Sequence, residues 1–85
     1  MPIISRFFGI IIYMFWRDHK PPHFHAKYGD DEVIVDIETG NISGIISKRA
    51  LNLIQEWRTK HKQELIMNWK LVEQNKPLNK IEPLE

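Results

Sequence analysis

The stretch HFHAKYGDDEVIVDIE, residues 23–38, decides the fold because it holds two alternating segments around a turn signal. The first segment, 23–28, places His23, His25 and a lysine on one face and apolar or aromatic residues on the other. The second segment, 32–38, places valine, valine and isoleucine on one face. The Gly-Asp-Asp between them is typical of a tight turn. A period of two on both sides of a turn predicts an antiparallel hairpin with one apolar face.

The run FFGIIIYMFW, residues 7–16, precedes this hairpin and is rich in β-branched and aromatic residues. We expect it to form one strand that is apolar on both faces, with residues 3–6 as its start or as a short piece before it. Such a strand has to be covered on both sides. We therefore expect a homo-oligomer or a partner protein on one side, or else helices and tail on opposite sides.

The same run is about half as long as the ~20 residues that a membrane-spanning helix requires. No small-residue cleavage site of a signal peptide follows it, only RDHKPPH. The sequence therefore predicts no membrane association and a cytoplasmic location.

The period changes after a short fourth strand predicted at 42–46. Apolar residues from Ala50 to Val72 recur every three or four positions, which indicates helix, and Ser47 is a suitable N-cap. One helix over 47–76 would measure roughly 40 Å, whereas a compact chain of this size has a radius of gyration of about 12 Å. We expect two helices that meet near residues 59–62, followed by an extended tail.

Strands followed by helices predict an α+β domain. We expect a single domain over 1–85, with an antiparallel sheet of three to four strands at about 3–46. Two C-terminal helices at about 47–76 should pack on one face, and the tail covers 77–85. The formal net charge is only +1, so any basic site must be local. The absence of cysteine from the sequence excludes disulfides and thiolate metal sites.

Three of the four histidines, His19, His23 and His25, lie within seven residues, and a Pro-Pro pair separates the first from the others. A two-residue turn at residues 30 and 31 would pair His25 with Asp36. A register shifted by two residues would instead pair His23 with Asp36. Either register puts carboxylates beside the imidazoles on the outer face, and we expect the pKa values of the strand histidines to rise.

This patch has three interpretations that the residues alone leave open. The histidines could move protons at a phosphodiester while cations hold its charge. The candidates for acid/base work are His19, His23 and His25, with Tyr28 as a positioning group; those for phosphate or RNA are Arg17, Lys20 and Lys27. They could instead bind zinc through their H-x₃-H-x-H spacing, with Asp18 or Asp36 nearby. The third interpretation is a half-exposed strand with cross-strand polar pairs and no chemistry.

A second candidate site is the sequence Ser47, Lys48 and Arg49 at the start of the first helix. Positive charge opposes the helix dipole there, but a bound phosphate would reverse the sign of that interaction. The alternative is a solvated helix start whose side chains bind nothing.

Several segments together resemble domain-of-unknown-function family 4160, a family of small bacterial proteins. They are MPIISRFFGIIIYMFW, DHKPPHFHAKYG, VDIETG, RALNLIQEW, LIMNW and PLNKIEPL. The resemblance implies the toxin of a toxin–antitoxin pair, encoded beside a second small protein, and supplies no catalytic residues.

We therefore expect a toxin that acts on RNA or translation, with an antitoxin-like partner. If it is an enzyme, a metal-independent ribonuclease without cofactor is expected. The alternatives are a non-catalytic protein- or nucleic-acid-binding module and a metal-binding domain that uses the same histidines.

Overall fold

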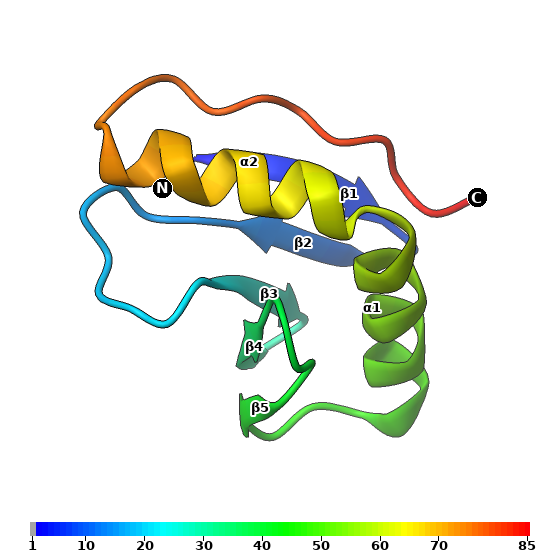
Figure 1. Ribbon diagram of the computed structural model, residues 1–85. Coiled ribbons are helices and arrows are strands. Elements are labelled where there is room, and N and C mark those ends of the chain that lie inside the picture. The colour runs from blue at the N-terminus through cyan, green and yellow to red at the C-terminus, as the bar shows by residue number, and fades with distance from the viewer. Residues whose placement is uncertain (1) are drawn as a thin grey trace.

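The computed structural model describes residues 2–85 and shows an α+β fold, as expected. Its antiparallel sheet has five strands in the order β1-β2-β3-β4-β5, not three to four, and two helices follow (Figure 1). The elements are β1 Ile3–Phe7, β2 Ile10–Tyr13, β3 His23–Tyr28, β4 Asp31–Asp36, β5 Ile42–Gly44, α1 Lys48–Lys60 and α2 Lys62–Glu73.

The additional strand comes from residues 7–16, which do not form one strand. Phe8 and Gly9 make a two-residue turn with φ of 49° and 81°, and Phe7 pairs with Ile10 across it. Two successive positive φ values are the geometry of the type I′ hairpin turn. Apolar residues on every side of this turn hide it from alternation. Within β2, only Ile10 and Ile12 belong to the hydrophobic core. The apolar surface on the second face of this short strand is therefore smaller than that expected for one strand over residues 7–16.

The β3–β4 hairpin turns at Gly29 and Asp30, one position before the turn first considered. Gly29 has a φ of 62°, and glycine is favoured at the first position of a type II′ turn. The register therefore pairs His23 with Asp36 and His25 with Ile34, which is the register shifted by two. The faces of the strands are unchanged by this shift because the side-chain period is two.

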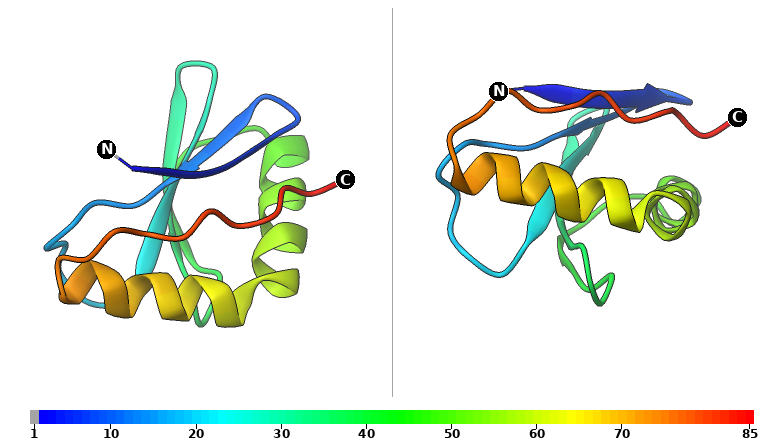
Figure 2. Two further views of the ribbon diagram at one scale, coloured as in Figure 1. Left: turned by 90° about the horizontal axis from the view of Figure 1, so that it is seen from above. Right: turned by 45° about the horizontal axis from the view of Figure 1, so that its top comes forward.

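The two helices meet at His61, where the chain changes direction sharply (Figure 2). Ser47 caps α1, since its hydroxyl oxygen accepts a hydrogen bond from the backbone N–H of Ala50 at 3.2 Å. Their buried residues join those of the sheet in one hydrophobic core, with the side chain of Trp57 fully buried within it. Among residues 2–85, neither helix has the length and apolar character needed to span a lipid bilayer.

The C-terminal tail runs as an extended segment beside β1 (Figure 2). The Ile81 N–H donates to the Ile4 carbonyl at 2.8 Å, and the Trp57 indole N–H donates to the Glu82 carbonyl at 2.8 Å. Ile81 and Leu84 belong to the same core as the helices. The tail therefore packs on the face of the sheet that carries the hydrophobic core. The opposite face carries His25 and contacts the loop between β2 and β3.

Candidate histidine–aspartate site

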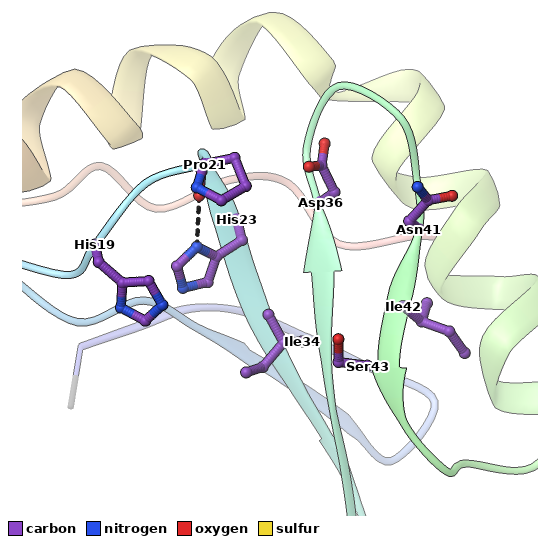
Figure 3. Close-up of a pocket in the computed structure, with 8 residues that line it drawn as sticks. All are labelled: His19, Pro21, His23, Ile34, Asp36, Asn41, Ile42 and Ser43. Atoms are coloured by element: carbon purple, nitrogen blue, oxygen red, sulfur yellow. Dashed lines mark hydrogen bonds between the residues drawn. The ribbon is translucent and has the colours of Figure 1, made fainter.

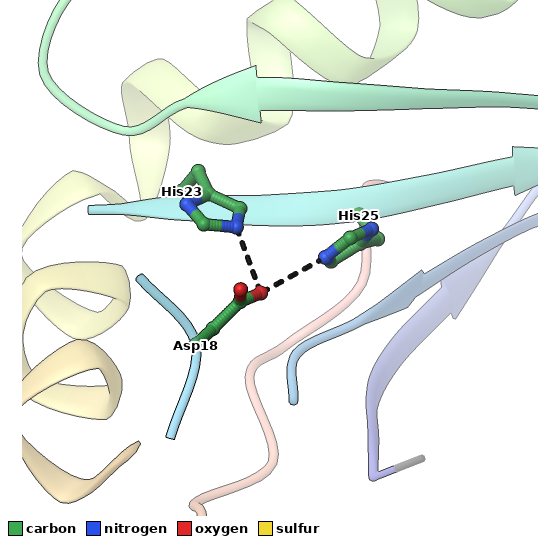
Figure 4. Close-up of side chains that lie close together, drawn as sticks. All are labelled: Asp18, His23 and His25. Atoms are coloured by element: carbon green, nitrogen blue, oxygen red, sulfur yellow. Dashed lines mark hydrogen bonds and ion pairs between the residues drawn. The ribbon is translucent and has the colours of Figure 1, made fainter. Parts of the chain in front are cut away.

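The strand β3 and the loop before it supply all members of a polar cluster. His23 and His25 are two residues apart and so project from the same face of β3. The loop between β2 and β3 brings Asp18 and His19 over this face, and Arg17 in it has a φ of 60°. In Figure 4 the carboxylate of Asp18 points at both strand imidazoles.

Asp18 is the centre of the cluster. His23 Nε2 lies 2.8 Å from Asp18 Oδ2, and His25 Nε2 lies 3.3 Å from the same oxygen. The other oxygen, Oδ1, lies 3.1 Å from His19 Nδ1 and accepts the His19 backbone N–H at 3.0 Å. One carboxylate therefore contacts three imidazoles, two of them on one oxygen.

The hydrogen-bond partner of His23 Nδ1 identifies which of the two ring nitrogens carries the hydrogen. His23 Nδ1 lies 2.7 Å from the Pro21 carbonyl oxygen, as Figure 3 shows. A carbonyl oxygen accepts hydrogen bonds and does not donate them, so Nδ1 carries the hydrogen. In the neutral ring Nε2 then directs a lone pair at Asp18 Oδ2.

The pKa of Asp18 is lowered from its ordinary value of 3.8. Burial by itself would raise this pKa, but hydrogen bonds from His25, from His23 and from the His19 backbone together outweigh it. Asp18 is therefore held as the carboxylate.

The pKa of His25 is lowered from 6.5, contrary to the expected rise. Burial is the main cause, and the hydrogen bond with Asp18 opposes it without overcoming it. The nearby charge of His23 lowers the pKa of His25 further. Burial thus favours the neutral imidazole of His25. The alternation of polar and apolar residues predicts the face on which a side chain lies, but it does not predict how deeply that side chain is buried.

The expected carboxylate, Asp36, is not the partner of His23 although the two residues are paired in the sheet. Asp36 Oδ1 instead accepts the backbone N–H groups of Glu38 and Thr39, both at 2.9 Å. It closes the turn between β4 and β5 and is occupied there.

Aromatic rings enclose the cluster. Tyr13, opposite His25 in the sheet, stacks on its imidazole at a centroid distance of 5.2 Å, and the Tyr13 hydroxyl donates to the Glu32 carboxylate. Phe15 meets His25 edge-on at 4.8 Å, and Trp69 of α2 lies 5.2 Å from the ring of His23. The side chains of His23 and His25 are accordingly only 6% and 12% exposed.

His19 differs from the other two histidines because its side chain is 86% exposed. Its Nδ1 lies at ion-pair distance, 3.1 Å, from Asp18 Oδ1, and within residues 2–85 neither ring nitrogen of His19 makes a hydrogen bond. His19 and His23 border an open pocket of about 260 Å³ (Figure 3). Its other lining residues are Pro21, Ile34, Asp36, Asn41, Ile42 and Ser43.

The remaining predicted residues are dispersed. Arg17 and Lys20 are exposed on the loop that carries Asp18 and His19, and Lys27 is exposed further along β3. Tyr28 has the parity of the core-facing residues and packs partly against the core, so it does not join the histidines.

The second candidate site, at the start of α1, stands apart from the cluster. Ser47, Lys48 and Arg49 are exposed, and no hydrogen bond or ion pair within residues 2–85 joins them to the histidines. The Ser47 hydroxyl accepts the capping hydrogen bond of α1.

Asp18 is missing from the predicted acid/base set. The sequence indicated it only as a possible metal ligand. Its signal is the Asp-His dipeptide that precedes the two prolines and the His-x-His of β3. A carboxylate placed just before a prolyl loop can fold back on the strand that the loop enters. Tyr13 and the Pro21 carbonyl, which support the rings, carry no such local signal.

Comparison with known proteins gives one finding. A family model described as a domain of unknown function, DUF4160, matches residues 9–70, a span that contains the whole cluster. No curated protein and no solved structure gives a significant match.

Proposed function

The chain belongs to the family described as domain of unknown function DUF4160, and from that membership and the site we propose a toxin of a bacterial two-gene module that acts on RNA or on translation. The toxin role rests on the resemblance described above. The chemistry rests on one observation: His19 Nδ1 lies 3.1 Å from Asp18 Oδ1, while the His19 side chain is 86% exposed beside a pocket.

An imidazole oriented by a carboxylate at one nitrogen can exchange protons at the other. His19 Nε2 would take the proton of a ribose 2′-hydroxyl, whose oxygen then attacks the adjacent phosphorus. The bond from phosphorus to the 5′ oxygen breaks, and the imidazolium returns the proton to that oxygen. The products are a 2′,3′-cyclic phosphate and a 5′-hydroxyl. This step needs no metal, and His23 and His25 serve it by positioning Asp18.

The surroundings of His19 suit a ribonucleotide. Arg17 and Lys20, exposed on the same loop, can contact phosphates, which position nucleic acids without reading their sequence. The pocket offers the Asn41 amide and the Ser43 hydroxyl, groups that hydrogen-bond base edges of unpaired RNA.

Exposed apolar residues near the site suit a protein partner. Phe15, Trp16 and Ile34 are 40%, 41% and 38% exposed. An antitoxin-like partner that covers them would also shield His19. A second copy of the chain is the alternative occupant, and the oligomeric state in solution distinguishes the two.

The test uses tag-free protein freed of any partner, with end-labelled RNA in EDTA and, separately, with a cell-free translation reaction. RNA is expected to yield 2′,3′-cyclic phosphate ends, and a strand with 2′-deoxy residues is expected to stay intact. His19→Ala should lower the rate by about 10²–10⁴-fold, the range of general acid–base catalysis. His61→Ala is the matched control, because His61 also bonds a carboxylate, Glu64, but lies between the helices.

Two results contradict the proposal. One is a wild-type protein that neither cleaves RNA nor inhibits translation. The other is a His19→Ala protein as active as wild type. In cells, expression should arrest growth, co-expression of the neighbouring gene should relieve the arrest, and His19→Ala should not arrest growth.

A further inference from the structure

We infer that Asp18, His23 and His25 bind one divalent transition-metal ion between their side chains. One ligand atom from each, a carboxylate oxygen and two imidazole nitrogens, lies within 4.8 Å of the others. This inference goes beyond the proposed function and does not rest on it, because His19 contacts the opposite oxygen of Asp18.

The spacing of the three atoms fits a metal site with little movement. Zinc bonds of about 2.0–2.2 Å to nitrogen and oxygen place tetrahedral ligand atoms roughly 3.4 Å apart. The two imidazole nitrogens lie 2.8 Å and 3.3 Å from Asp18 Oδ2. Both distances are within about 0.6 Å of that spacing, and the two imidazole nitrogens lie within 4.8 Å of each other, so a modest rearrangement of these side chains would admit an ion.

The supporting contacts are those of a metal-binding histidine. Such a histidine donates its other ring N–H to a carbonyl or carboxylate, which fixes the tautomer that binds the metal. His23 does this through Nδ1 and the Pro21 carbonyl at 2.7 Å, which leaves the Nε2 lone pair directed at Asp18. An ion at this point would accept the Nε2 lone pair and contact the Asp18 carboxylate at the same time. Tyr13 and Phe15 hold the ring of His25 from two sides.

The ligand set selects the class of ion. Two imidazole nitrogens with one carboxylate oxygen suit zinc, cobalt or iron(II), whereas magnesium prefers oxygen ligands and retains its water. Three protein ligands leave one or more positions for water on an ion of this class.

The test measures metal alone, without RNA. Tag-free protein is treated with EDTA, exchanged into buffer, and titrated with Zn²⁺ and Mg²⁺ by calorimetry and with Co²⁺ by visible absorption. We expect one Zn²⁺ or Co²⁺ per chain, a cobalt spectrum of nitrogen and oxygen ligands, and no binding of Mg²⁺. His25→Ala should weaken Zn²⁺ binding by at least about 100-fold, since even indirect supports of a ligand are worth 10–100-fold.

His61→Ala is the control and should bind one Zn²⁺ like wild type. Should His25→Ala fail to fold by circular dichroism, Asp18→Asn and the cobalt spectrum of the wild type decide the question. No stoichiometric binding by the wild type overturns the inference, as does unchanged affinity in the folded Asp18→Asn or His25→Ala protein. Because no RNA is present, this outcome is independent of whether the protein cleaves RNA.

Discussion

Replacing Asp18 by alanine should destabilise the metal-free protein far more than removing a comparable carboxylate elsewhere. The substitution leaves His23 Nε2 and His25 Nε2 without their partner, and these side chains are only 6% and 12% exposed. Water cannot easily replace the lost acceptor at such depth. The substitution also releases the loop between β2 and β3, because Asp18 connects this loop to β3.

The magnitude follows from the two contacts. A hydrogen bond to a charged group contributes about 1.5–3 kcal/mol, and an unsatisfied buried polar group costs about 1–3 kcal/mol. The His23 contact at 2.8 Å should lie at the strong end, and the His25 contact at 3.3 Å should be weak. Together they give about 2–4 kcal/mol, a large part of the roughly 4–13 kcal/mol expected for a domain of this length.

Glu64→Ala is the matched control. It also removes a carboxylate from a histidine, at 2.6 Å from His61, but the Glu64 side chain is 52% exposed. An exposed pair of this kind contributes about 0–1 kcal/mol.

Urea unfolding followed by circular dichroism in EDTA measures both variants. With a slope of about 1–2 kcal/mol per molar urea, Asp18→Ala should lower the midpoint by about 1–4 M. Equal midpoints for Asp18→Ala and Glu64→Ala would refute the view that this carboxylate holds the loop on the sheet.

Three further substitutions test the fold, each by thermal unfolding against wild type. Phe8→Asn should stabilise by about 0.5–1 kcal/mol, since asparagine before Gly9 suits the positive φ of the turn; a loss would count against the turn. Gly44→Ala should destabilise by about 1–3 kcal/mol because φ is 110° and its Cβ would lie 2.6 Å from a β4 carbonyl oxygen; an unchanged midpoint would contradict this geometry. Asn68→Ala loses both hydrogen bonds to the Asn79 backbone, at 2.9 and 3.0 Å. It should cost about 1–3 kcal/mol and expose the tail to proteolysis, and a protected tail would contradict its docking.

The sequence predicts those parts of the fold in which polar and apolar residues contrast. The strand of His23 and His25 has the predicted bounds, and the helices meet at His61, within the predicted interval. The turn at Phe8 and Gly9 could not be located, because apolar residues fill both flanks. The β3–β4 register was ambiguous for a different reason: Gly-Asp-Asp accommodates a two-residue turn at either pair of positions, and only packing selects one.

The candidate site divides in the same way. Alternation is enough to place His23 and His25 on one face, because both lie on one regular strand. The position of Asp18 depends on the path of a loop through a positive φ at Arg17 and two prolines. No short-range periodicity encodes such a path, so the sequence left open which carboxylate, Asp18 or Asp36, lies beside the histidines.

The dependence of the cluster on Asp18 links its stability to its chemistry. The loop delivers His19 to the pocket only while Asp18 is held by the strand histidines, whose Nε2 atoms make no other hydrogen bond within residues 2–85. A substitution at His23 or His25 should therefore act on His19 through the loop even though neither ring faces solvent widely. This separates a positioning role from a catalytic one: loss at His19 should leave the loop in place, whereas loss at His23 should displace it together with the residue that it carries.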